Sequence, residues 1–162
     1  MLDWCNASLD HRSDLSSFRC TEPNNATFDD ETGLEYHDYP WEFEVQRHLN
    51  RLRPPAHVPG FLFLGFDSDG LAAVIEMQVT PLDRHCFISA VAVAQRVSGR
   101  GLAGEAIDRV QNVMDKYGFS SDYIVEALVD PDNHAAKSAF RGREFNSVGV
   151  RNGYEVWARL VP

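Results

Sequence analysis

The sequence has few of the residues that build disulfide frameworks and metal centres. Its three cysteines, Cys5, Cys20 and Cys86, are an odd number and show no Cys-x-x-Cys spacing. Neither a disulfide scaffold nor a zinc site is therefore expected. The six histidines are scattered and include no His-Glu-x-x-His motif, so we predict a protein without a bound metal.

Long hydrophobic runs are absent, and positive charge is scarce. No stretch has the length of a membrane span, and the N-terminus lacks a basic segment followed by an apolar one. These two absences predict a cytoplasmic protein that does not bind membranes. The 24 acidic residues outnumber the 15 basic ones, which gives a formal charge of −9. Nucleic acid is therefore an unexpected partner, whereas a cationic substrate would be attracted.

The 162 residues, 44% of them hydrophobic, suit a single globular domain over residues 1–162. Residues 1–40 are polar and form a variable N-terminal segment. We expect a short strand or helical turn near 15–20 and a long loop over 24–33. Pro40 then opens an amphipathic helix in which Trp41 and His48 are expected as core and flanking residues rather than ligand contacts.

The rest of the chain predicts a mixed fold. Strands are expected over residues 61–66, 71–79 and 87–94, joined by short turns into an antiparallel meander. A long helix over 102–117, a strand over 123–129 and a helix over 134–143 follow. A hairpin closes the chain, with strands over 147–150 and 154–161 around Asn152 and Gly153.

The stretch from residue 91 to residue 104 combines an apolar strand, a glycine turn and a helix start. Val91 and Val93 belong to the strand. Backbone N–H groups at the start of a helix have no partner within the helix, and the helix dipole adds positive charge there. A phosphate or pyrophosphate could therefore sit on them, although a tight turn alone would also explain the glycines. The turn and first helical residues are Ser98, Gly99, Arg100, Gly101, Ala103 and Gly104.

A second motif follows at a fixed distance. Asn133 is followed by Ala136, Phe140 and Phe145. Together with the glycine segment, this order resembles the Gcn5-related N-acetyltransferase (GNAT) family. The glycine segment is similar to the family's Arg/Gln-x-x-Gly-x-Gly/Ala loop in a register that starts at Ser98; an alternative register starts at Arg96.

The resemblance implies a fold and a cofactor. The fold is α/β (α+β), with a mixed, mostly antiparallel central sheet flanked by helices in the order (β)ααβββαβαββ. The cofactor is acetyl-CoA, with its pyrophosphate on the amides of residues 98–104 and its pantetheine arm beside Val91 and Val93. Asn133 would contact that arm. Phe140 stands where many members carry a tyrosine that protonates the leaving thiolate, and Glu144 replaces a glycine.

The implied activity is transfer of an acetyl group to a primary amine of a small molecule or a protein. Because a phenyl ring cannot donate a proton, water or Tyr154 would serve as the acid. Two other functions stay open, namely a non-catalytic acyl-CoA-binding regulator and a toxin-type enzyme that acetylates aminoacyl-tRNA. The resemblance also leaves a homodimer open.

Candidates for the base that deprotonates the amine are the carboxylates Glu126 and Glu76, each inside an apolar strand, together with His85 and Asp83. Glu126 is the first choice, because its strand borders the expected cleft. Desolvation in such a strand would raise the pKa of either glutamate toward the working range.

Overall fold

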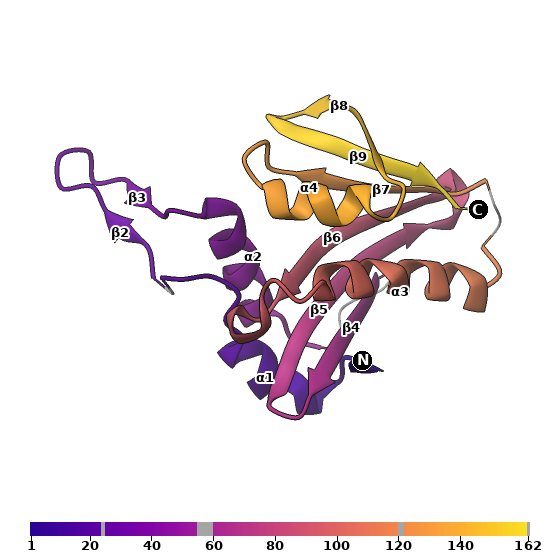
Figure 1. Cartoon of the computed structure of the whole chain (residues 1–162), viewed down its shortest axis with the longest axis horizontal. Helices are drawn as coiled ribbons and strands as arrows, with labels where there is room; N and C mark the ends of the chain where they lie inside the picture. The colour runs from indigo at the N-terminus through magenta and orange to yellow at the C-terminus, as the bar shows by residue number, and fades with distance from the viewer. Residues whose placement is uncertain (24, 55–59, 120–121, 162) are drawn as a thin grey trace.

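The computed structural model describes residues 1–23, 25–54, 60–119 and 122–161. A sheet of seven strands in the order β1-β4-β5-β6-β7-β9-β8 runs through the molecule, and a small two-stranded sheet pairs β2 with β3 (Figure 1). All neighbouring strands are antiparallel except β6 and β7, which are parallel. The strands are β1 (Asp3–Asn6), β2 (Thr27–Phe28), β3 (Glu35–Tyr36), β4 (Gly60–Asp67), β5 (Gly70–Thr80), β6 (His85–Val93), β7 (Ile124–Val129), β8 (Asn146–Arg151) and β9 (Tyr154–Leu160).

Helices cover both faces of the large sheet. One buried cluster packs α3 and α4 against it, and a second packs α1 and α2 on the opposite face, as the alternation of Val74 and Ile75 between the two clusters requires. The α-helices are α1 (Arg12–Ser17), α2 (Pro40–Arg51), α3 (Leu102–Lys116) and α4 (His134–Arg141), and short 3₁₀ turns occur at η1 (Leu9–His11), η2 (Pro81–Asp83) and η3 (Gln95–Val97).

The element boundaries follow from local chemistry. Pro40 is the first residue of α2, where its missing N–H costs nothing. Gly118, with φ +68°, follows the end of α3 in the left-handed conformation that glycine tolerates best. Asn152 and Gly153, with φ of +52° and +85°, form the turn between β8 and β9, as the Asn-Gly signal predicted.

The predicted fold class and order of elements are confirmed, and the N-terminal segment needs correction. Strand β1 pairs with β4 at one edge of the large sheet. The short strand or helical turn predicted near 15–20 corresponds to α1 (Arg12–Ser17), which begins and ends three residues earlier. The expected loop over 24–33 contains β2, which pairs with β3 in a hairpin that projects beyond the N-terminal end of α2 (Figure 1).

Two negative findings concern the described residues alone. None of their helices is long and apolar enough to cross a membrane. They also contain no group of three or more His, Cys, Asp or Glu side chains arranged to hold a metal ion.

Candidate functional site

A cleft opens where the parallel strands β6 and β7 come apart. β6 and β7 pair from His85–Ile124 to Ile88–Ala127, and no further pairing follows although both strands continue. The cleft has a volume of about 140 Å³. It is lined by Trp41, Glu44 and Val45 of α2, residues 88–91 of β6, residues 127–130 of β7 and its following turn, Asn133, Ala136 and Phe140 at α4, and Tyr154 of β9.

A β-bulge shapes the β6 side of this cleft. Glu76 pairs with Ala90 whereas Met77 pairs with Ile88, so Ser89 is the extra residue. Bulges commonly redirect side chains next to functional sites. The Ser89 hydroxyl is buried at the cleft and finds no hydrogen-bond partner within the described chain. Val91 lines the cleft, whereas Val93 lies beyond its lining.

The glycine turn leads from β6 into α3 and presents unpaired backbone donors. Gly99 and Gly101 have φ of +76° and +78°, in the left-handed region that glycine adopts most readily. For the N–H groups of residues 99–103, no hydrogen-bond acceptor exists in the part of the chain that the structure describes. Ser98 donates its own N–H to Gln95, so the free amides begin one residue later than predicted.

Two arginines lie at this end of α3. Arg100 is exposed and makes no ion pair within the described residues. A Cβ on Gly104 would overlap the guanidinium of Arg143, which pairs with Asp108 at 3.1 Å. Glycine at position 104 therefore allows Arg143 to cross the first turn of α3.

The side chain of Arg96 pairs with Asp67 and not with the glycine turn. Its two terminal nitrogens lie 2.7 Å from the two carboxylate oxygens of Asp67. This pairing, together with weaker contributions, holds the pKa of Asp67 down at about 2. Arg96 therefore clamps the β4–β5 turn, and α3 begins at Leu102, which supports the loop register that starts at Ser98.

Asn133 and Phe140 lie on the side of α4 that faces the cleft. Asn133 caps the helix, since its side-chain oxygen accepts the N–H of Ala136 at 3.0 Å. Its amide NH₂ has no acceptor among the described residues and remains available at the cleft. Phe140 is buried and packs edge-on against Phe145, with 5.1 Å between ring centroids.

Glu76 pairs with a histidine that the sequence did not single out. Its carboxylate lies 2.7 Å from Nε2 of His48, on the α2 face of the sheet. The hydrogen bond to Glu76 raises the pKa of His48 against the opposing effect of desolvation. His48 is about half exposed, with 47% of its side chain accessible, so the expectation of a merely flanking residue is incomplete.

Glu126 is held by a cation. Arg151 of β8 donates to both carboxylate oxygens at 2.7 and 3.2 Å, and Nε2 of His85 lies 3.8 Å away. Glu126 belongs to the part of β7 that still pairs with β6 and does not line the cleft. The structure thus separates the two predicted carboxylates, and Asp83 is exposed in η2.

Comparison with known proteins places these features in a family. The sequence profile of the acetyltransferase (GNAT) family matches residues 22–145, which is most of the chain. The chain belongs to the GNAT family. No curated protein matches the sequence.

Solved GNAT-fold structures agree with this assignment at low sequence identity. PaiA N-acetyltransferase from Thermoplasma acidophilum, in complex with coenzyme A, superposes with a TM-score of 0.74 at 10% identity, over 99% of both chains. The ribosomal-protein-S18-alanine N-acetyltransferase of Escherichia coli gives 0.63 at 13%, over 99% of this chain and 94% of its own. The spermidine/spermine N-acetyltransferase SpeG of Vibrio cholerae gives 0.64 at 14%, over 99% and 95%. Likeness at this level concerns the fold alone.

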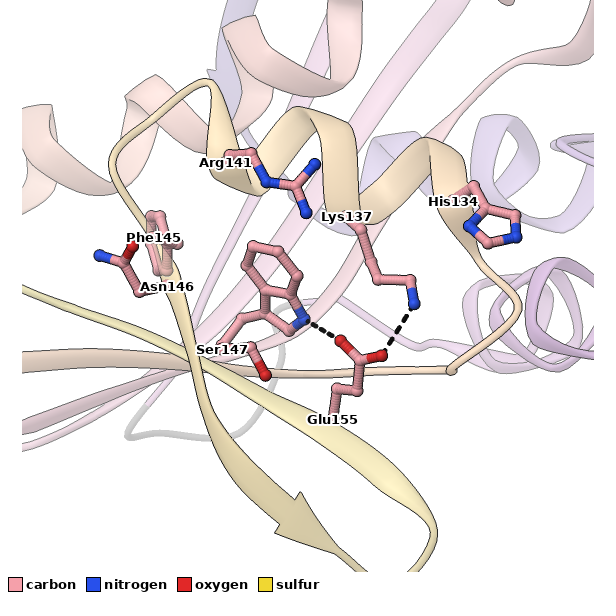
Figure 2. Close-up of a pocket in the computed structure, with 8 residues that line it drawn as sticks. His134, Lys137, Arg141, Phe145, Asn146, Ser147 and Glu155 are labelled. Atoms are coloured by element: carbon pink, nitrogen blue, oxygen red, sulfur yellow. Dashed lines mark hydrogen bonds and ion pairs between the residues drawn. The ribbon is translucent and has the colours of Figure 1, made fainter.

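In this GNAT protein the other side of α4 borders a second hollow, of about 430 Å³, between α4 and the β8–β9 hairpin (Figure 2). Lys137 and the indole N–H of Trp157 both bond to Glu155, at 2.8 and 2.9 Å. Only 15% of the Lys137 side chain is exposed. This network fastens α4 to β9 and thereby fixes the side that carries Asn133 and Phe140.

Several cleft residues of this GNAT protein escaped sequence reasoning. Ser89 lines the cleft because of a bulge, which leaves no recognisable pattern in the sequence. Outside the cleft, Arg143 reaches the start of α3 from the turn that follows α4, and this contact could not be predicted either. Trp41 and Val45 of α2 also line the cleft. Trp41, Val45 and His48 are at positions i, i+4 and i+7 and therefore share one side of α2. This spacing was the signal in the sequence that they could contact the same site.

Proposed function

We propose that this protein transfers an acetyl group from acetyl-CoA to a primary amine of a small molecule or a protein by direct attack. The observation that carries the proposal is the cleft between β6 and β7, which has a loop of unpaired amides beside it. Such amides bind phosphate groups, and a gap in a sheet accepts an extended chain.

The residues present suit acetyl-CoA. The pyrophosphate would accept hydrogen bonds from the amides of residues 99–103, with Arg100 and Arg143 as cations beside it. The pantetheine arm would lie along Val91, and the free NH₂ of Asn133 would donate to one of its carbonyl groups. The thioester would then lie near Ser89 and Phe140.

The chemistry requires a neutral amine, a stabilised oxyanion and a proton for the leaving thiolate. The amine nitrogen attacks the thioester carbon, and collapse of the tetrahedral oxyanion breaks the C–S bond. A backbone amide of residues 89–91 and the unpartnered hydroxyl of Ser89 would stabilise that oxyanion. On β6 the lining of the cleft ends at Val91, so an amide near Val93 would lie beyond it.

Tyr154 is the best-placed proton donor for the thiolate. Of the described residues that line the cleft, only Ser89 and Tyr154 carry a hydroxyl group, and Phe140 has none. A phenol is the more acidic of the two and is protonated at neutral pH. Tyr154 would therefore do from β9 what a tyrosine at position 140 does in other members.

His48 is the proposed base, with Glu76 orienting it. A lysine-like amine has a pKa of about 10.4 and needs help to lose its proton at neutral pH. His48 follows the cleft residues Glu44 and Val45 by one helical turn, so it would act through a water molecule. The bidentate pair with Arg151 makes Glu126 a weaker candidate.

The pH dependence of the reaction tests this pair. A base must be unprotonated, so the acid limb of kcat/KM is expected to have its midpoint above 6.5, the ordinary pKa of histidine. Glu76→Gln removes the hydrogen bond that raises the pKa and should move the midpoint to lower pH. His48→Gln should remove the acid limb. NMR titration of the His48 ring follows the pKa directly, and Glu126→Gln is the matched control. An unchanged acid limb in Glu76→Gln and His48→Gln would refute the assignment.

The acceptor is proposed to be cationic. Between Cys20 and Gln46 the sequence contains eight acidic residues and no lysine or arginine. This segment includes the β2–β3 hairpin and the start of α2, and Glu44 of α2 lines the cleft. A positively charged amine would be drawn toward it.

The proposed function is tested by following free thiol while the protein turns over acetyl-CoA with spermidine, a lysine-rich peptide, an alanine-terminated peptide or an acidic peptide. We expect thiol release that depends on an added amine and is faster with the cationic acceptors, with acetylated product identified by mass spectrometry. Calorimetry of CoA binding runs in parallel. Binding without release for any amine would establish the non-catalytic acyl-CoA-binding protein instead.

A further inference from the structure

A separate hollow lies at the edge of the large sheet that β1 forms. It has a volume of about 240 Å³, and none of its lining residues belongs to the cleft between β6 and β7. Three elements line it: β1 with Trp4, Cys5 and Asn6, β4 with Phe63, and α3 with Arg109, Asn112, Val113, Lys116 and Tyr117.

Arg109 is held in this hollow without an acceptor for its N–H groups. Its guanidinium carbon lies 5.6 Å from the ring centroid of Trp4 and 5.7 Å from that of Phe63, which is cation–π distance. Its Nε atom is buried and unpaired within the described chain. Because Nε has almost no accessible surface, an anion in the hollow would bond to the terminal nitrogens of the guanidinium, which also have no acceptor among the described residues.

The charges around Arg109 favour an anion. Lys116 lies two turns further along the same side of α3 and lines the same hollow, and no aspartate or glutamate does. Glu105, one helical turn before Arg109, accepts hydrogen bonds from the Trp4 indole and the Leu2 amide, and the charge of Arg109 helps to lower its pKa. Asp108, next to Arg109 in the sequence, pairs with Arg143. Asp115, next to Lys116, accepts a hydrogen bond from Gln111. Two cations without a lining carboxylate stand out in a chain of formal charge −9.

We propose that this hollow binds a small organic anion, whose phosphate or carboxylate group pairs with Arg109 and Lys116 and whose apolar part lies against Trp4 and Tyr117. The side-chain amides of Asn6 and Asn112 provide further donors at the rim. Charge-assisted bonds from a guanidinium fixed between two rings are strong, because little side-chain freedom is lost on binding. This site does not depend on the proposed acetyl transfer.

Cys5 provides a built-in reporter for the test. It lines the hollow and is partly exposed, and burial followed by the charge of Asp14 raises the pKa of its thiol. Cys20 and Cys86 are buried, and burial raises the pKa of both to about 12. Alkylation by iodoacetamide should therefore occur first at Cys5, and mass spectrometry of peptides gives its rate. The probes are phenyl phosphate and benzoate, with benzamide and benzylamine as uncharged and cationic counterparts of similar size.

We expect a saturating anionic probe to slow Cys5 alkylation about tenfold, with no effect of benzamide or benzylamine at the same concentration. The stronger of phenyl phosphate and benzoate identifies the preferred oxyanion. Arg109→Gln and Lys116→Gln should each lower the affinity for the anionic probe about tenfold or more, so that a higher probe concentration is needed to protect Cys5. Arg141→Gln is the matched control, since it removes an arginine that lies 5.4 Å from the Trp157 ring at a different site; its protection should equal that of the wild type.

Equal alkylation rates with anionic and neutral probes would overturn the proposal. So would unchanged protection in Lys116→Gln, a variant of an exposed residue that folds even if Arg109→Gln does not. Protection lost equally in Arg141→Gln would mean that overall charge, and not this hollow, attracts the anion, which also refutes it.

Discussion

Replacing Gly101 with aspartate is expected to weaken acetyl-CoA binding by about 100-fold or more while the protein remains folded. Gly101 directly precedes α3, and no atom lies within 4 Å of the position a Cβ would take. The new carboxylate would stand among the amides proposed to hold the pyrophosphate. Like charges brought together at a binding site cost several kcal/mol. A negative charge at this end also favours the helix dipole, so a loss of binding would not come from a weaker helix.

Two variants separate charge from backbone strain. Gly101→Asn has nearly the same shape without the charge and tolerates a positive φ, so it should bind far better than Gly101→Asp. Gly118→Asp introduces the same residue at a similar φ, +68° against +78°, at the other end of α3, and should bind like the wild type. Calorimetry with CoA measures all three. Equal affinity in Gly101→Asp and Gly101→Asn would place the pyrophosphate elsewhere.

The second large effect is expected at Tyr154. If its hydroxyl protonates the thiolate, Tyr154→Phe should lower kcat about 100-fold, the lower end of the range for a positioned acid. The affinity for CoA should change little, because that ring only borders the cleft. The loss should be smallest for acyl donors with acidic thiols, since a good leaving group needs no proton. If Tyr154 had only a structural role, Tyr154→Phe would slow turnover equally with all acyl donors. A smaller loss with a donor that has an acidic thiol therefore indicates proton donation.

A substitution at Phe140 should restore the turnover that Tyr154→Phe loses. Phe140→Tyr places a hydroxyl where other family members carry it, so the double variant Phe140→Tyr/Tyr154→Phe should recover much of the lost turnover. Phe140→Leu is the control, because it alters the packing against Phe145 without adding a donor. Wild-type turnover in Tyr154→Phe would mean that water donates the proton, and failure of the double variant to recover would show that position 140 does not face the sulfur.

The sequence predicted the elements that carry strong periodic or turn signals. The meander, the helix after the glycine turn and the Asn-Gly hairpin all lie within a few residues of their predicted bounds, because each depends on contacts close in the chain. The segment before Pro40 was predicted poorly. Strand β1 has four residues, and β2 and β3 have two each; strands this short are specified by their partners rather than by a pattern of their own.

For the candidate site, too, residues in local motifs could be predicted from the sequence, whereas contacts between distant segments could not. The glycine turn, Asn133 and Phe140 could be predicted, since each belongs to a local motif. The partners of Glu76 and Glu126 could not, because His48 and Arg151 are 28 and 25 residues away in the sequence. A carboxylate in an apolar strand indicates that a partner exists, and only the tertiary fold decides which one.

Because of the extra residue in β6, even-numbered residues before Ser89 and even-numbered residues after it point to opposite faces of the sheet. Before Ser89 the even-numbered residues Cys86 and Ile88 belong to the α3 core, and after it Ala90 and Ala92 belong to the core under α1 and α2. One strand thus contributes to both cores, with larger side chains under one helix layer and alanines under the other. Deleting Ser89 would exchange these faces from that point on, so the register of this sheet is intolerant of a change in length at the position where the cleft begins.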